Sequence, residues 1–600
     1  MPRPFYIGSG ESASFAVFHP ASELDGEARK PPVLFCSPWG WEDVASYRVR
    51  REWAARFAAG GFPTLRFDLP ATGNSAGTVR DGDVPGSWVT SVAAAAGWLA
   101  ETQDVAGVAA IGFGLGGLLA LLAVAAGAPI AALALWGTPG SGRRFARETK
   151  AFSGMQAWYG DDAADFDPGV PEGWVEAGGF ALSPETLAGL GKLKPALEPG
   201  TSLERALLLD RDGVPPEPAL VEALEAGGVE VTTAPGPGWG NLVSHPEQAT
   251  LPRPVAMDVE RWLVAAPDGA SGEAPPERPA PPVAAAETLE LEAVEDVGVG
   301  VGAVRETALA LEQRWGRTIG VLTEPAAGVD SDLCAVFLNA GAVRCTGPNR
   351  LWVETARRWA GRGVSSLRLD LEGIGEADGD AGGTLQVADF YVPRYERQVI
   401  EVLDQLERRE VGRRFVLVGL CAGGFWAFRA AVEDPRVVGT VHLNAGALRW
   451  HDDLLVRREA HKGSRAFDLH WWRKLLSSEV EVRRIRELLR SLLVNARQTL
   501  VRPFRREAAP ATILAGVEAD LDRLQEAQTS VLIAFSGEEP LGIEVERDRL
   551  AGRGERWPNV EFATLPGSDH TLRALSAQRA TRDLLDGALE RLRGGDRVPG

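Results

Sequence analysis

The stretch Phe415–Gly424, F-V-L-V-G-L-C-A-G-G, decides how the rest of this chain folds. Its apolar, β-branched start predicts a short buried strand, and its glycines predict a tight turn into the helical pattern of Phe425 to Val432. Gly419, Cys421 and Gly423 form the pattern G-x-C-x-G, which is typical of a nucleophile elbow with cysteine in place of serine. A thiol at a helix N-terminus also ionises more readily, because the helix dipole favours the thiolate. The alternative is a buried structural cysteine in a strand-to-helix turn.

The composition predicts several folded domains and argues against some partners. Hydrophobic residues make up 45% of the 600 residues, which is enough to bury full cores. The net charge of −19 argues against nucleic acid as the main partner, because no basic field neutralises phosphates. Residues 1–14 lack the basic and then apolar run of a signal peptide.

Cysteine usage predicts a reducing, cytoplasmic environment. The four cysteines have neither the spacing of a metal site nor the density of a disulfide framework. They are Cys36, Cys334, Cys345 and Cys421. We also expect no metal and no cofactor.

One stretch, Val108 to Gly137, imitates a membrane span because it carries no charge. Four glycines interrupt it near residue 114, and Gly127 and Pro129 interrupt it again. This punctuation favours a strand, a turn, a helix and a second strand of a buried parallel sheet, and no membrane span is expected.

The chain divides into two halves that repeat one another. Residues 266–287 are rich in Pro, Ala and Gly without an apolar period, which predicts a linker. Across this linker the order of strands, helices and glycine turns is the same, which predicts two copies of one α/β domain over residues 1–265 and 288–600. The matching segments are Pro32–Trp41 with Cys334–Val343, Arg56–Gly77 with Arg358–Gly379, and Ile111–Gly117 with Val418–Gly424.

On these motifs both halves resemble the α/β-hydrolase superfamily. The second half is also similar to members that carry cysteine in the elbow, such as dienelactone hydrolases and polyhydroxyalkanoate synthases. The resemblance implies, in each half, a mostly parallel sheet with helices on both faces and a lid insertion. It also implies a triad in the chain order nucleophile, acid, histidine.

The first half is expected to be non-catalytic. Its elbow has Gly114 at the nucleophile position, and a glycine offers no nucleophile. Asp210 or Asp212 fills the acid position, but Trp239 stands near the histidine position and His245 comes several residues late. The G-x-G-x-x-G pattern around Gly114 does not indicate a dinucleotide site, because it follows a later strand and no acid stands about twenty residues on.

The second half keeps all three triad positions. After the elbow and a further strand, the apolar run from Ser530 ends at Glu539, the expected acid, with Glu538 as its rival. His570 follows a strand and a glycine turn, which is the expected position of the base. His442, by contrast, lies inside a strand and is expected to be a core residue.

An oxyanion formed on the substrate needs two backbone donors. One is expected to be the amide of Ala422, and the other that of Gly341 or Ala342 in the loop after the strand at residues 335–338. The loop Arg344–Arg350 either borders this pocket or is a surface turn made by its Gly and Pro.

A lid is expected at about residues 451–528. Between His451 and Pro510 there are fourteen Lys and Arg against eight Asp and Glu, and apolar residues recur at helical spacing. Such helices either pack over the sheet with solvated arginines or form a cap for a substrate with an apolar acyl part and an anionic part.

Two classes of function follow from the sequence. The first is an acyl hydrolase or acyltransferase that forms a thioester on Cys421, with His570 as base and Glu539 as orienting acid, and acts on a small-molecule or carrier-bound ester, thioester or lactone. The second is a non-enzymatic tandem pseudohydrolase that binds or scaffolds. In either case we expect the two halves to pack on each other.

Overall fold

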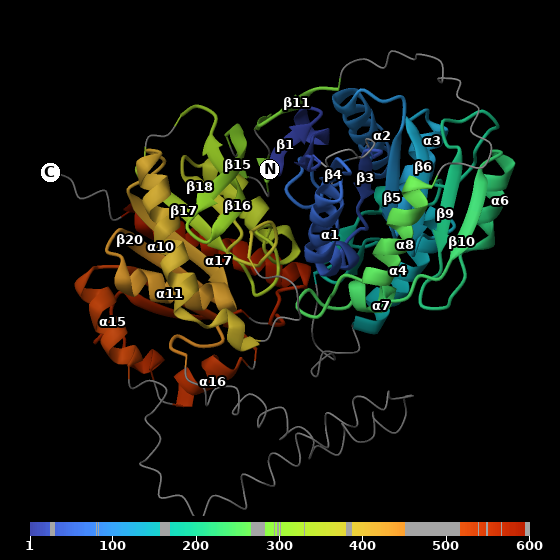
Figure 1. The fold of residues 1–600 in the computed structure, drawn as a ribbon. Helices are drawn as coiled ribbons and strands as arrows, with labels where there is room; N and C mark the ends of the chain where they lie inside the picture. The colour runs from blue at the N-terminus through green and yellow to red at the C-terminus, as the bar shows by residue number, and fades with distance from the viewer. Residues whose placement is uncertain are drawn as a thin grey trace, which may run out of the picture.

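The protein forms two sheet-centred halves that lie side by side (Figure 1). The structure is a computed structural model, and it describes residues 1–23, 30–79, 81, 83–156, 169–265, 283–292, 295–296, 299–300, 302–328, 331–379, 387–450, 516–537, 539–547, 550–565 and 567–594. Glu538 and residues 451–515 of the expected lid lie outside the described residues.

The first half is built on a nine-stranded sheet in the order β10-β9-β6-β5-β3-β4-β2-β1-β11. Neighbours from β10 to β4 pair in parallel, and the remaining pairs are antiparallel. In chain order the strands are β1 (Arg3–Ile7), β2 (Ser14–His19), β3 (Val33–Cys36), β4 (Thr64–Phe67), β5 (Val108–Phe113), β6 (Ile130–Trp136), β9 (Arg205–Leu209), β10 (Glu230–Ala234) and β11 (Ala285–Ala286).

Helices cover both faces of this sheet and bury an apolar cluster on each. One face carries α2 (Val84–Gln103), α3 (Leu115–Ala125) and α6 (Pro218–Ala226), and the other carries α1 (Trp41–Ala59) and α8 (Arg253–Val264). The uncharged stretch from Val108 to Gly137 therefore forms β5, α3 and β6, as the sequence predicts. Between β6 and β9 the chain inserts α4 (Gly142–Gln156), the hairpin β7 (Val175–Ala177) and β8 (Phe180–Leu182), and α5 (Pro184–Leu190). The short helix α7 (Trp239–Leu242) follows β10.

The second half repeats this plan on the sheet β12-β15-β16-β18-β17-β19-β20-β21-β22. Strands from β18 to β22 pair in parallel, and β12, β15 and β16 add antiparallel neighbours. Parallel strands are covered on both faces, which explains the continuous apolar run of the central strand β19. The strands are β12 (Thr288–Leu291), β15 (Val304–Gln313), β16 (Gly316–Pro325), β17 (Leu333–Leu338), β18 (Ser365–Leu369), β19 (Arg414–Leu420), β20 (Val437–Leu443), β21 (Ser530–Ser536) and β22 (Val560–Leu565), with a separate pair β13 (Glu295–Asp296) and β14 (Val299–Gly300).

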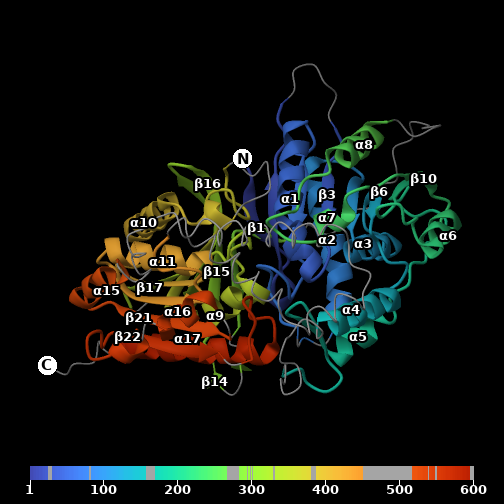
Figure 2. The same cartoon turned by 90° about the horizontal axis from the view of Figure 1, so that it is seen from below.

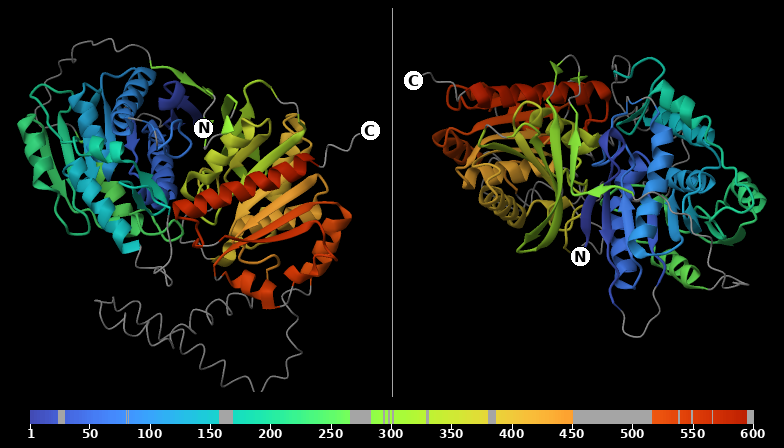
Figure 3. Two further views of the ribbon diagram at one scale, coloured as in Figure 1. Left: turned by 180° about the vertical axis from the view of Figure 1, so that it is seen from behind. Right: turned by 90° about the horizontal axis from the view of Figure 1, so that it is seen from above.

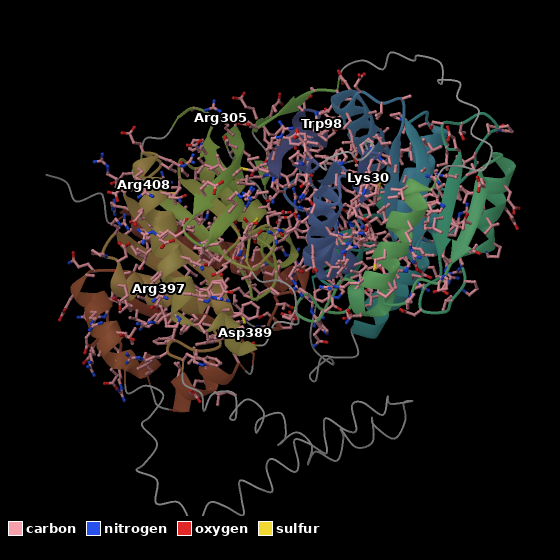
Figure 4. All side chains as sticks on the ribbon, viewed as in Figure 1. Lys30, Trp98, Arg305, Asp389, Arg397 and Arg408 are labelled. Atoms are coloured by element: carbon pink, nitrogen blue, oxygen red, sulfur yellow. The ribbon has the colours of Figure 1, made fainter. Side chains whose placement is uncertain are left out.

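Helices again sandwich the sheet, with α10 and α11 on one face and α9 and α17 on the other (Figure 2). Their bounds are α9 (Leu351–Ala360), α10 (Pro393–Arg408), α11 (Ala422–Glu433), α15 (Val517–Glu526), α16 (Pro540–Arg547) and α17 (Leu575–Gly594). Arg397 and Arg408 of α10 lie on the outside of this half (Figure 4).

Two segments near the predicted boundaries belong to the folded halves. Ala285 and Ala286, at the end of the predicted linker, pair as β11 with β1 of the first sheet. At the end of the predicted lid, Val517, Leu521 and Leu524 of α15 are buried in the core of the second half. Both segments find tertiary partners that their local composition does not reveal.

The two halves bury a shared apolar cluster where β1 and β2 meet β12, β15 and β16. The helix α17 crosses the back of the second half with its beginning toward the first (Figure 3). There Gln578 donates a hydrogen bond to the carbonyl of Gly179, at 2.9 Å.

Polar contacts between the halves are reciprocal. Tyr47 and Arg51 of α1 bind Glu376 and Asp378, which follow β18. In return Arg350 binds the loop that follows β4 in the first half. Equivalent elements of the two copies thus exchange contacts, as in an isologous dimer.

The loop Arg344–Arg350 is not a surface turn. Arg344, Cys345, Thr346 and Arg350 are each less than 8% exposed. The surface-turn interpretation is wrong because Arg344 and Arg350 bind the first half, whose docking the local sequence does not encode.

Candidate active site

Cys421 occupies the sharp turn between β19 and α11. It is the residue before the first turn of α11, with φ +57° and ψ −116°, a left-handed conformation that non-glycine residues seldom adopt. A Cβ on Gly419 would lie 2.1 Å from the backbone carbon of Gly423, and one on Gly423 would lie 2.3 Å from the carbonyl oxygen of Asn339. Glycine is therefore required on either side of the cysteine, as the pattern G-x-C-x-G predicts.

His570 and Glu539 lie at the carboxyl ends of neighbouring strands. Glu539 follows β21, is 8% exposed, and places Oε1 2.9 Å from Nδ1 of His570 after β22. Asn444, at the end of β20, donates Nδ2 to the carbonyl of His570 at 2.9 Å and accepts the amide of Ser536 at 2.7 Å. Asn444 thus ties the loop that carries the imidazole to the ends of β20 and β21.

The imidazole of His570 also contacts Cys421. Burial lowers the pKa of His570, but the Cys421 sulfur, to which the ring is hydrogen-bonded, and the Glu539 carboxylate together raise that pKa well above its usual value. The structure therefore brings together the three residues that the sequence predicts as nucleophile, base and acid.

Tyr391 borders the sulfur and was not foreseen from the sequence. Its hydroxyl lies 3.9 Å from Sγ of Cys421, and its ring stacks on Trp450 with centroids 4.3 Å apart and packs on Phe425 at 5.1 Å. Tyr391 lies in the connection before α10 and follows no motif or period. Only the tertiary structure places it at the site.

The loop after β17 lies beside the elbow. Asn339 closes this loop by donating Nδ2 to the carbonyl of Val343 at 3.1 Å, and its backbone oxygen is the atom that excludes a side chain on Gly423. Gly341 has φ +57° in this loop, and Ala342 is 5% exposed. Ala422, the first residue of α11, is 1% exposed. The three predicted oxyanion donors thus lie on the two segments that meet here.

The corresponding turn of the first half has the same backbone but no nucleophile. Gly114 has φ +51° and ψ −127°. A Cβ at this position would lie 2.6 Å from Oε2 of Glu42 and 3.3 Å from Cβ of Pro38. Burial raises the pKa of Glu42 to about 7.

The residues near the acid and histidine positions of the first half have structural partners. Trp239, after β10, is 4% exposed and packs on Trp136 at 5.4 Å. Asp210 accepts the backbone amides of Gly213 and Gly236, so its carboxylate braces a loop. His245 is exposed and contacts the ring of Trp41.

His442 is a core residue, as predicted. It is fully buried, and burial lowers its pKa to about 4. Its Nδ1 lies 2.8 Å from the carbonyl oxygen of Gly424, so the ring supports the first turn of α11.

Within the described ranges, no cluster of three or more His, Cys, Asp or Glu residues is arranged to hold a metal ion. Among the helices of the same ranges, none has the length and apolar character needed to cross a bilayer.

Each half matches the model of a hydrolase family. Residues 350–573 match the serine aminopeptidase family S33, and residues 11–164 match the X-Pro dipeptidyl-peptidase family S15. No curated protein sequence matches the chain.

Similar solved structures include a proline iminopeptidase from Mycobacterium smegmatis, with 17% identity, 48% of this chain and 98% of that chain covered, and a TM-score of 0.31. A dienelactone hydrolase from Anabaena variabilis has 14% identity, coverage of 48% and 97%, and a TM-score of 0.29. A structure from a study of carboxylesterases of Nitrososphaera gargenis has 14% identity, coverage of 48% and 100%, and a TM-score of 0.30.

The two sheets with helices on both faces, together with a hydrolase family matched in each half, identify a tandem α/β-hydrolase-fold protein of the hydrolase class.

Proposed function

We propose that the second half is a cysteine-dependent acyl hydrolase or acyltransferase that acts on an ester, thioester or lactone. The observation that carries the proposal is the position of His570, whose imidazole contacts Cys421 and binds Glu539 through Nδ1. The left-handed turn at Cys421 presents the sulfur at the head of α11, where the helix dipole favours a thiolate.

The reaction begins with proton transfer from Cys421 to His570. The thiolate attacks the acyl carbonyl carbon, and the carbonyl π electrons move to its oxygen to form an oxyanion. The amide of Ala422 and that of Gly341 or Ala342 supply its donors. When the tetrahedral intermediate collapses, His570 gives its proton to the departing alcohol or thiol, and a thioester on Cys421 remains.

Deacylation runs through the same imidazole. His570, now neutral, takes a proton from water or from an acceptor hydroxyl, thiol or amine, which attacks the thioester carbonyl. The second tetrahedral intermediate expels the Cys421 thiolate, and the acid or the transferred acyl product leaves. Glu539 keeps the proton of the neutral ring on Nδ1, so that the other nitrogen accepts.

The four cysteines make a clean test possible. Cys36, Cys334 and Cys345 are fully buried, and burial raises the pKa of each thiol, whereas Cys421 is partly exposed. Brief treatment with iodoacetamide should therefore add one carboxamidomethyl group, at Cys421.

The protein is then incubated with a panel of aryl esters and acyl thioesters and weighed intact. We expect an acyl adduct that is absent from Cys421→Ala and is blocked by prior alkylation. If no acyl donor of the panel leaves an adduct on Cys421 and none is hydrolysed or transferred, the proposal is contradicted. That result would favour the non-enzymatic binding protein.

A further inference from the structure

The segment that supplies the second predicted oxyanion donor is fastened from both halves of the protein. We call residues 339–344 the site loop. On its own side, Asn339 donates to Asp370 at 2.6 Å and accepts the amide of Leu371 at 3.1 Å. These bonds fix where the site loop leaves β17.

The other end of the site loop is held by the first half. Arg344 is 4% exposed, and its Nη1 lies 2.9 and 3.0 Å from the two carboxylate oxygens of Asp68. Its Nη2 lies 3.2 Å from Oδ2 of Asp43, and its guanidinium lies 3.9 Å from the centroid of the Tyr47 ring. All three partners lie on α1 or just after β4.

These contacts belong to a buried charge cluster that straddles the halves. Three arginines face three carboxylates around the Tyr47 ring, so the charges balance. Since desolvation offsets much of the attraction inside a protein, such a cluster is tolerated only when its geometry is complete, and it fixes position more than it adds stability. The six residues are Arg50, Arg66, Arg344, Asp43, Asp68 and Glu376.

Arg350, six residues after Arg344, forms a second set of contacts with the first half. Arg350 donates to the carbonyls of Gly73 and Gly77 at 3.0 and 2.9 Å, and also to that of Ser75. In addition, a Cβ on Gly341 would lie 3.7 Å from Oε1 of Glu247, a side chain of the first half. The first half thus borders the site loop itself.

We infer that Arg344 is a positioning residue through which the first half sets the conformation of the oxyanion donors in the second. This inference rests on the proposed function. The first half, which has no nucleophile at its own elbow, then acts as a built-in scaffold for the other active site. Asp68 and Asp43 hold the guanidinium, the guanidinium holds the backbone of the site loop, and that backbone presents the amide of Gly341 or Ala342.

Two chemical reactions of the same sulfur test this role. Acylation of Cys421 by an aryl ester passes through an oxyanion and needs the site loop. Alkylation by iodoacetamide displaces iodide from carbon, forms no oxyanion, and needs only the thiolate. We expect Arg344→Lys, which keeps the charge but loses the two-pronged contact, to slow acylation about 10- to 100-fold, while alkylation stays within about twofold of the wild-type rate.

Asp68→Asn tests the same contact from the first half, and it should slow acylation selectively as well. The matched control is Arg51→Gln, which removes another contact between the halves, the 3.1 Å pair with Asp378, and should leave both rates unchanged.

Equal loss of both reactions in Arg344→Lys and Asp68→Asn, or loss of neither, overturns the inference. A wild-type protein that is alkylated but never acylated or turned over overturns the proposed function instead.

Discussion

The elbows of the two halves have nearly the same backbone conformation but different side chains around them. Gly114 and Cys421 differ by 6° in φ, at +51° and +57°, and each precedes a helix that follows a buried central strand. Around Cys421 stand an imidazole, a carboxylate and a phenol hydroxyl, whereas the space beside Gly114 is taken by the Glu42 carboxylate. The turn conformation is therefore a property of the fold that both halves share. Whether an elbow can be catalytic depends on the side chains around it.

Replacing Cys421 with Gly makes the second elbow resemble the first, and we expect the largest effect here. Ester turnover should fall about 10⁴-fold or more because the nucleophile is lost. The free energy of unfolding should change by less than about 1 kcal/mol, because glycine adopts a positive φ without strain. Initial rates and denaturant unfolding measure the two effects. A variant that keeps more than about a hundredth of the wild-type rate would show that another group attacks the substrate.

Glu539→Gln should produce the next largest loss. Without the carboxylate the imidazole loses the group that orients its Nδ1 proton, so kcat should fall about 10²- to 10⁴-fold with little change in KM. Steady-state kinetics provides the measurement. Glu561→Gln, on β22 and paired with Arg591, is the matched control and should behave as wild type. Full activity in Glu539→Gln would remove it from the triad.

Gly114→Cys tests whether a thiol alone can make the first elbow reactive. The new Cβ would lie 2.6 Å from Oε2 of Glu42, so we expect the free energy of unfolding to fall by about 1 to 3 kcal/mol. We expect no acylation when the change is made in the Cys421→Ala background, because the buried Glu42 side chain takes the space beside the new thiol and no imidazole replaces Trp239 as a base. Intact mass after ester treatment decides the outcome, and an acyl adduct would contradict a non-catalytic first half.

Glu42 should make stability depend on pH. Its pKa is about 7 in the fold and about 4.3 in an unfolded chain, so the folded state keeps a proton that the unfolded state releases. The stabilising contribution is therefore full below about pH 4.3, falls as the pH rises toward 7, and is lost above 7. Relative to Glu42→Gln, the wild type should lose about 2.5 kcal/mol in unfolding free energy between pH 5 and pH 8. The unfolding free energy of each protein is measured by denaturant titration at several pH values. An equal pH dependence in the two proteins would contradict this prediction.

Tyr391→Phe should have the smallest effect. The hydroxyl lies 3.9 Å from Sγ, a weak contact, while the stacked ring on Trp450 is preserved, so acylation should slow about two- to fivefold. Tyr395→Phe is the control, because its hydroxyl binds the carbonyl of Glu372 instead. Equal rates in the two variants would show that the Tyr391 hydroxyl has no part in the reaction.

The sequence alone determined the features that depend on local backbone geometry. Glycine spacing around Cys421 specifies a turn that no larger residue permits, and the repeated order of strands and glycine turns specifies two similar sheets. Glu539 and His570 could be predicted because each follows the end of a strand, where the resemblance to the α/β-hydrolase superfamily implies the acid and the histidine, and the carboxyl ends of parallel strands meet at one edge.

Only the tertiary structure decided what surrounds these residues. Tyr391 reaches the sulfur from a connection without a motif, and Glu42 fills the first elbow from a helix more than seventy residues earlier in the chain. Arg344 meets Asp68 across 276 positions of sequence, in a loop whose composition suggests a surface turn. Such contacts depend on how the folded segments pack on one another. The residues that packing brings together share no sequence pattern that could predict the contact. The physical reason is that turn geometry is set by neighbours along the chain, whereas burial and charge pairing are set by neighbours in space.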